Sequence, residues 1–204
     1  MTDEKKLIER VLSGDAEAFS DLMALHEKQV YNLCLRMTGH QEDAKDLAQE
    51  AFIKAWRGLQ FYKFESSFST WLYRLTSNVC IDFLRQQKRR ATDCLIMTDD
   101  NGEETELEIV DSAPLPEQQA EARENREQIA SALLQLEEEF RLALTLRVVD
   151  ELSYEEIAEV LNLKPGTVKS RIARARTKLK IILLQNGNFF CNDSSNSTER
   201  RAAP

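Results

Sequence analysis

The chain has 204 residues, of which 42% are hydrophobic and 30% charged, so it can bury a core and is neither a disordered nor a fibrous protein. Its six glycines and four prolines stand among many helix-forming residues, which favours helices over a turn-rich β architecture. The net charge of −8 comes from one segment, residues 99–127, which hold eleven acidic residues and two arginines. The charge of the remaining residues sums to about +1, so the acidic total does not exclude nucleic-acid binding.

Apolar residues recur at helical spacing through the first 92 residues and predict an N-terminal helical domain, 1–92. The pattern predicts a helix at about 19–37 with Leu25 on its apolar face, a second helix at about 41–59 and a third at about 67–90. The chain opens with charged residues and holds no apolar run of ~18 residues. We therefore expect a cytoplasmic protein with no membrane insertion.

The helix at 41–59 carries an isoleucine on its outer face. Its core face holds small and apolar residues together with Trp56, while the opposite face holds Asp46, Gln49 and Glu50 around Ile53. A single exposed isoleucine is ordinary on a protein surface. An apolar centre inside a polar rim is also the pattern of a small protein–protein contact, and the residues alone leave both interpretations open.

The helix at 67–90 has a buried stripe and a basic outer face. We expect Phe68, Leu72, Leu75, Val79 and Phe83 to be buried. The far side holds Ile81 and four polar residues, Arg74, Asn78, Arg85 and Lys88, and Trp71 lies nearby. The four polar side chains are candidate contacts to a nucleic-acid strand, and Trp71 is a candidate for stacking on a base. Trp71 fits core packing as well as stacking, so its role stays open at this stage.

An acidic stretch without a sustained apolar stripe predicts a flexible linker at 93–115. A C-terminal helical domain, 116–184, follows, with helices at about 117–135 and 138–149, a third that begins at the capping-box residue Ser153, and a fourth that begins at Pro165. The polar residues 185–204 predict a disordered tail. The expected fold is therefore all-α: two small helical domains joined by a flexible acidic linker.

The last two helices form a helix-turn-helix pattern, which is typical of proteins that read the major groove of DNA. Residues 164–184 hold seven Lys or Arg and no acidic residue. Val168, Ile172, Ala175 and Leu179 share the expected core face. The candidates for base contacts near the start of the helix are Thr167, Lys169 and Ser170, and those for phosphates are Arg171, Arg174 and Lys178. A solvated amphipathic helix is the alternative.

Several segments together resemble the sigma-70 family of bacterial RNA polymerase promoter-specificity factors, and most closely its short, two-domain extracytoplasmic-function group. The residues that carry the resemblance are 43–56 (DAKDLAQEAFIKAW), 68–75 (FSTWLYRL), Asn78, Asp82, Arg85, 154–158 (YEEIA), 166–171 (GTVKSR) and 174–176 (RAR). The resemblance spans about 10–184. Lys164 departs from it, since a capping Ser or Thr is more usual at that position.

The resemblance implies a sigma factor that directs promoter recognition, DNA opening and transcription initiation. Asp46, Gln49 and Glu50 match positions that dock on the β′ clamp coiled coil of core RNA polymerase. The loop 61–69 and the helix that follows it would open and read the −10 element of promoter DNA. The helix-turn-helix would bind the −35 element and contact the β flap. Whether an anti-sigma factor binds the chain is left open.

Two other functions deserve comparison with a sigma factor. A stand-alone helix-turn-helix transcriptional regulator would bind a palindromic duplex without polymerase. A nucleic-acid-processing enzyme would need a catalytic or metal site, but the isolated glycines form no phosphate loop, and the four cysteines and two histidines show no metal-ligand spacing. We therefore expect no enzyme activity and no cofactor.

Overall fold

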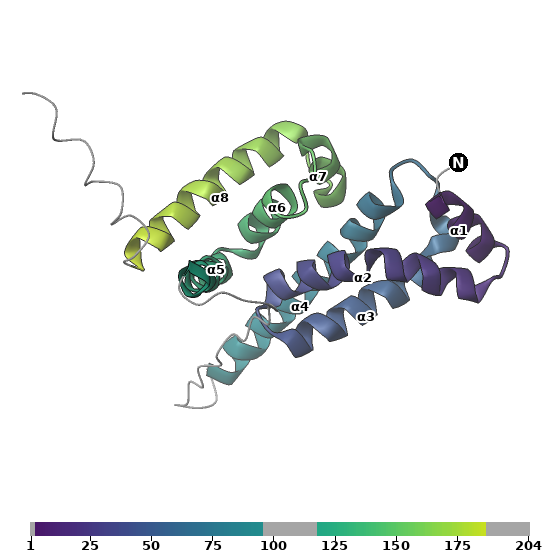
Figure 1. Ribbon diagram of the computed structural model, residues 1–204. Coiled ribbons are helices and arrows are strands. Elements are labelled where there is room, and N and C mark those ends of the chain that lie inside the picture. The colour runs from purple at the N-terminus through teal and green to yellow at the C-terminus, as the bar shows by residue number, and fades with distance from the viewer. Residues whose placement is uncertain (1–2, 96–117, 187–204) are drawn as a thin grey trace, which may run out of the picture.

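The computed structural model describes residues 3–95 and 118–186, in which every regular element is a helix (Figure 1). The elements are α1 (Asp3–Leu12), α2 (Ala16–Thr38), α3 (Gln41–Gly58), the 3-10 helix η1 (Leu59–Phe61), α4 (Phe68–Leu95), α5 (Gln118–Leu134), α6 (Glu138–Val148), α7 (Tyr154–Leu161) and α8 (Pro165–Gln185). The all-α prediction is confirmed for these residues. Most of the predicted linker and of the predicted tail lies outside them.

Helix α1 was not predicted, and α2 begins and ends at clear signals. The Asp15 side chain accepts hydrogen bonds from the backbone N–H groups of Glu17 and Ala18, which caps the N-terminus of α2. At the other end Gly39 adopts a φ of 79°, a left-handed conformation that favours glycine. A short turn, residues 13–15, joins α1 to α2, and the two helices pack against each other.

The N-terminal domain is a bundle in which α2 packs against α1, α3 and α4. Its fully buried side chains include Leu22, Leu33 and Met37 of α2. Cys34 and Cys80 meet in this core with 3.7 Å between their sulfur atoms. The hydrogen bond to Cys34 and burial together raise the pKa of the Cys80 thiol well above its ordinary value. Of the predicted core positions, Leu25 is exposed, and Leu75 and Phe83 are only half-buried.

The last two helices of the C-terminal domain, the short α7 and the long α8, begin where the sequence predicted. Ser153 Oγ accepts the Glu156 backbone N–H at 3.1 Å, and the Glu156 carboxylate accepts the Ser153 N–H at 2.8 Å, which completes the capping box of α7. Helix α8 begins with Pro165, and the preceding Lys164 provides no side-chain cap. Val168, Ile172 and Ala175 of α8 are buried, whereas Leu179 is half-buried.

The two domains pack against each other, which the sequence did not predict. Helix α7 lies on α4, and α5 and α6 lie on α2, so that α5–α8 flank α2 and α4 in Figure 1. The buried Arg141 of α6 donates hydrogen bonds to carbonyl oxygens of its own domain, Leu133 and Leu136 at 3.0 Å each and Leu134, and also to the Met37 carbonyl of α2. The C-terminal ends of two helices thus share one cation, an arrangement that the helix dipole favours.

A second contact between the domains involves the loop after α6. The Tyr73 hydroxyl of α4 and Arg36 of α2 lie near the Asp150 carboxylate, whose Oδ2 is buried with no hydrogen-bond partner among the described residues. Burial raises the pKa of Asp150 to about 6, although both neighbours act in the opposite direction.

No described helix is long and apolar enough to cross a membrane.

Candidate nucleic-acid and protein interfaces

The outer face of α3 combines apolar and acidic side chains. Asp46, Gln49 and Glu50 are exposed, and Ile53 retains 44% of its surface. Trp56 was expected in the core, but its side chain retains 45% of its surface and covers the edge of Phe19, with ring centroids 4.8 Å apart. The face therefore presents two large apolar groups beside a cluster of carboxylate and amide groups, which suits a protein partner.

The outer face of α4 is basic along its length. Arg74, Asn78 and Arg85 are exposed, and Ile81 is half-buried. Lys88 is exposed but forms an ion pair with Glu138 at the start of α6. The three exposed side chains offer an amide and two guanidinium groups on one side of a long helix, which suits contact with bases and phosphates.

Trp71 is buried in this structure, and of the two roles that the sequence left open its position fits core packing. Its side chain is 8% exposed and packs between Tyr62 and Phe68, with ring centroids 5.4 and 5.5 Å away. A Cβ added at Gly58 would lie 3.3 Å from the Trp71 ring, so the glycine leaves room for the indole. Trp71 therefore supports the loop before α4 from inside.

The loop between η1 and α4 exposes two other aromatic side chains. Phe61 retains 74% of its surface and Phe64 43%, and Phe64 adopts a φ of 58°, which is unusual for a bulky residue. Tyr62 fixes the loop by donating a hydrogen bond to the Ser66 carbonyl at 2.7 Å. The sequence indicated that this loop is aromatic, but it could not show which of the rings faces solvent.

The outer face of α8 is divided between exposed and paired side chains. Thr167, Lys169, Ser170 and Arg174 are exposed, and the Ser170 hydroxyl donates to the Thr167 carbonyl at 2.9 Å. Arg171 pairs with Glu139 at 2.9 Å, and Lys178 pairs with Glu137. All six side chains lie outside the core, so the helix presents a polar, basic surface with Pro165 and Thr167 at its N-terminal end.

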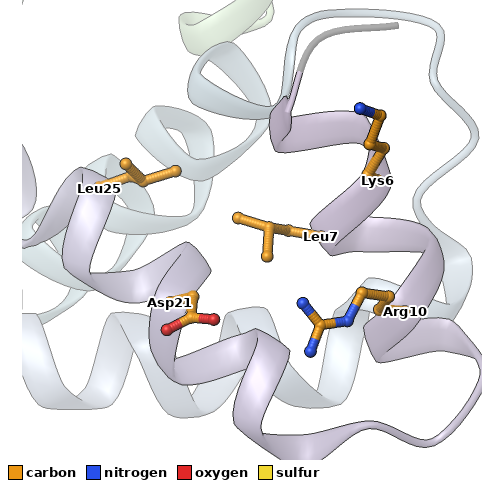
Figure 2. A pocket seen from close by; sticks show the side chains of 5 residues that line it. All are labelled: Lys6, Leu7, Arg10, Asp21 and Leu25. Carbon is orange, nitrogen blue, oxygen red and sulfur yellow. The ribbon is translucent and has the colours of Figure 1, made fainter.

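No group of three or more His, Cys, Asp or Glu side chains that could hold a metal ion occurs among the described residues. The structure has a shallow hollow between α1 and α2, lined by Lys6, Leu7, Arg10, Asp21 and Leu25 (Figure 2). Two leucines face each other across it, with one carboxylate and one guanidinium group at its edge. The hollow is lined by none of the candidate contact residues for polymerase or DNA, and it includes Leu25, which the sequence had placed in the core.

Comparison with known proteins gives two family matches. Residues 22–90 match the model of sigma-70 region 2, and residues 126–179 match that of sigma-70 region 4. The chain is 38% identical over 176 residues to the ECF RNA polymerase sigma factor SigW of Bacillus subtilis, which covers 86% of this chain and 94% of that protein. It is also 38% identical over 179 residues to the ECF RNA polymerase sigma-E factor of Escherichia coli K12, covering 86% and 91%.

Solved structures show the same fold. CnrH in complex with the cytosolic domain of CnrY matches with a TM-score of 0.64 and 25% identity over 91% of this chain and 99% of that one. The sigma factor RpoE of Bartonella quintana, in complex with the anti-sigma factor NepR, also gives a TM-score of 0.64, at 22% identity over 85% of this chain and 100% of that one. With both family matches in order along one chain, the protein belongs to the sigma-70 family, in its extracytoplasmic-function group, and is a sigma factor that directs core bacterial RNA polymerase to promoters.

Proposed function

We propose that three faces of this sigma factor bind three different targets. The outer face of α3 docks on the β′ clamp coiled coil of core RNA polymerase through Asp46, Gln49, Glu50 and Ile53. The loop before α4 and the outer face of α4 read and open the −10 element. Helix α8 reads the −35 element as duplex, and its domain also contacts the β flap.

The observation that carries this assignment is the exposed apolar centre of α3. Four alanines and Leu47 fill the core face of α3, so Ile53 is left on the outside of the helix, beside Trp56, which packs on Phe19 but remains 45% exposed. Asp46 and Glu50 lie one turn apart beside these two side chains. Among the described residues, Glu50 forms an ion pair only with Lys54 of its own helix, at 2.8 Å. These carboxylates are therefore available to a basic partner surface.

The docking face is tested by changing Asp46→Ala together with Glu50→Lys. Both side chains point away from the core, so the fold should remain intact, while binding to core polymerase should be lost. The matched control is Asp21→Ala with Glu27→Lys, two exposed acidic residues of α2. Recovery of core polymerase by the first variant at the wild-type level in a pull-down would contradict the assignment.

In the −10 region we propose that Phe61 and Phe64 supply the aromatic contacts, since Trp71 is buried, together with Arg74, Asn78, Arg85 and Lys88. Changing Asn78 should impair recognition or opening near the start site. Changing Lys169 or Ser170 should instead alter the preference at the upstream duplex element by roughly 1–3 kcal/mol for a specific base contact. Sequencing transcripts from a promoter library transcribed by core polymerase with each variant measures both; shifts at the same bases would contradict separate roles.

The same assay separates a sigma factor from a stand-alone regulator, because only a sigma factor makes transcription by core polymerase promoter-specific. We further propose that the chain acts in the cytoplasm, where the polymerase is, and that it redirects an enzyme without catalysing a reaction itself. We also propose an anti-sigma factor as a partner, because the structural relatives CnrH and Bartonella RpoE were solved in complexes, the latter with an anti-sigma factor. Co-purification from cells that express a tagged chain tests this partner.

A further inference from the structure

Three consecutive glutamates at the start of α6 hold cations from both DNA-binding helices. Glu137 pairs with Lys178 of α8, Glu139 pairs with Arg171 of α8 at 2.9 Å, and Glu138 pairs with Lys88 of α4. We call Glu137–Glu139 the acidic turn. Each of its partners is a residue that the sequence marked as a contact to DNA.

Glu138 and Glu139 stand in the first turn of α6, where the helix dipole favours acidic side chains, but this preference requires no particular cation as a partner. Glu137 is the residue before the first turn of α6 and makes no capping hydrogen bond with its side chain. Its side chain retains 64% of its surface, and that of Glu139 retains 58%. Burial by itself would raise the pKa of Glu138, but the hydrogen bonds with Lys88 and with the backbone and the charges of Lys88 and Arg141 together lower it. All three carboxylates are therefore directed at cations of other helices.

We propose that the acidic turn is a built-in competitor of DNA: in the free chain its carboxylates occupy Lys88, Arg171 and Lys178, and in the promoter complex DNA phosphates replace them. Carboxylate and phosphate oxygens accept the same charge-assisted hydrogen bonds, so one group substitutes for the other. This inference rests on the proposed function, because it takes α4 and α8 as the DNA-contacting helices.

The distances also require that the contact between the domains be released. Since Glu137 and Glu139 flank Glu138 in the chain, the charged groups of Lys88, Arg171 and Lys178 lie within roughly 20 Å of one another. The −10 and −35 elements are about 25 base pairs, or roughly 85 Å, apart along B-form DNA. One chain cannot place both helices on their elements while the acidic turn holds them together, so promoter binding breaks the pair between Lys88 and Glu138.

The pairs of the acidic turn are weak enough to be displaced. Ion pairs between largely exposed side chains contribute little in water and are screened by salt. Removing the two pairs to α8 should therefore tighten binding to DNA about three- to tenfold at low salt. The effect should diminish as salt rises, because screening weakens the internal competitor.

The first experiment compares full-length chains in titrations of a short duplex of mixed sequence, since phosphate contacts do not depend on sequence. The test variant is Glu137→Gln with Glu139→Gln. The control is Glu155→Gln with Glu159→Gln, which removes the same charge from exposed positions of α7 that form no ion pair among the described residues. Tighter binding by the test variant than by the control supports the proposal. Equal gains would mean that only net charge matters and would overturn it.

The second experiment uses the unmodified protein. A carbodiimide joins a lysine to a carboxylate that it touches, so it should link Lys88 to Glu138 and Lys178 to Glu137 in the free chain, as identified by peptide mass spectrometry. Adding duplex DNA should reduce the Lys178 link, and adding core polymerase with promoter DNA should remove both. Links that persist in bound complexes would overturn the competitor role while leaving the proposed function intact. Absence of DNA binding by every chain, even with core polymerase, would refute the proposed function itself.

Discussion

Trp71 is buried and Phe61 is exposed to solvent, and single substitutions distinguish the packing role of the first from the proposed DNA-contacting role of the second. Trp71→Ala should lower the free energy of unfolding by about 3–5 kcal/mol, because it leaves a cavity between Tyr62 and Phe68. Phe61→Ala should leave stability within about 0.5 kcal/mol, because its ring is largely in solvent. Urea unfolding monitored by circular dichroism gives both values.

The same pair should behave in the opposite way toward DNA. In holoenzyme, Phe61→Ala should weaken binding to single-stranded −10 DNA by about 1–3 kcal/mol if its ring stacks on a base. Trp71→Phe, which largely fills the site, should bind this strand nearly as the wild type does. A large loss of strand binding for Trp71→Phe at full stability would return the stacking role to Trp71.

Asp150 should make the stability of the folded chain depend on pH. Its pKa is about 6 in the folded chain and near 3.8 when unfolded, so the folded state binds more protons between these values. The stabilising contribution of this group is complete below pH 4 and is lost as pH rises toward 6. The Asp150→Asn variant should therefore be more stable than the wild type at pH 7, and its advantage should shrink as pH falls below 6.

Urea unfolding of the wild type and of Asp150→Asn at several pH values measures this difference, which changes by no more than about 1.4 kcal/mol per pH unit. Because Tyr73 and Arg36, both from the other domain, are the groups that face Asp150, separating the domains should remove the effect. A constant difference between the two proteins from pH 4.5 to 7 would show that the carboxylate is hydrated.

Residue roles were predictable where helical periodicity alone decides exposure. The outer positions of α3 and α8 follow from one period, and the structure leaves Asp46, Glu50, Lys169 and Arg174 in solvent. The orientation of Trp71 was not predictable, because it depends on the loop that packs Tyr62 over it. Arg171 and Lys178 are exposed by their positions on the wheel, but their pairing depends on α6, which approaches α8 only in the folded domain.

Helices α7 and α8 begin differently, and the difference should be measurable as stability. Ser153→Ala should lower the free energy of unfolding by about 0.5–2 kcal/mol, because it removes the cap of α7. Lys164→Ser should raise it by a similar amount, because the backbone at this position is already extended as a cap requires. Thermal unfolding of both single variants checks the signs; a loss of stability for Lys164→Ser would mean that the lysine has an unrecognised contact.

At the level of elements, the sequence predicted the starts and ends of seven helices to within a few residues but missed α1. Caps and breakers such as Gly39, Ser153 and Pro165 act locally, so they are visible in the sequence. Helix α1 is short and mostly charged, and only its pairing with α2 buries Ile8 and Val11. Helix α4 continues to Leu95, past the basic run where the sequence pattern ended it.

The packing of the two domains predicts that the chain unfolds as one unit. Both tryptophans, Trp56 and Trp71, lie in the N-terminal domain, so their fluorescence reports that domain alone, whereas far-ultraviolet circular dichroism reports all helices. The two signals should follow one urea transition, since α2 and α4 share a core with α5, α6 and α7. An earlier change in circular dichroism than in fluorescence would show that the C-terminal domain detaches first.

This packing could not be predicted, because contacts far apart in sequence leave no periodic pattern. Arg141 looks like an ordinary surface residue of an amphipathic helix, and only the folded chain brings the Met37 carbonyl to it. Gly39 ends α2 in a left-handed conformation, and it also has a steric role: a Cβ there would lie 2.6 Å from Leu134 of the other domain.

The reactivity of the buried pair of thiols between α2 and α4 reports how often the N-terminal domain opens. Cys34 and Cys80 have no exposed surface, and the raised pKa of Cys80 keeps its sulfur protonated. A thiol-modifying reagent reaches them only when the core of the N-terminal domain opens, because the thiolate is the reactive form. In a chain with Cys94 and Cys191 replaced by serine, the labelling rate under native conditions therefore measures how often this core opens, with and without polymerase bound.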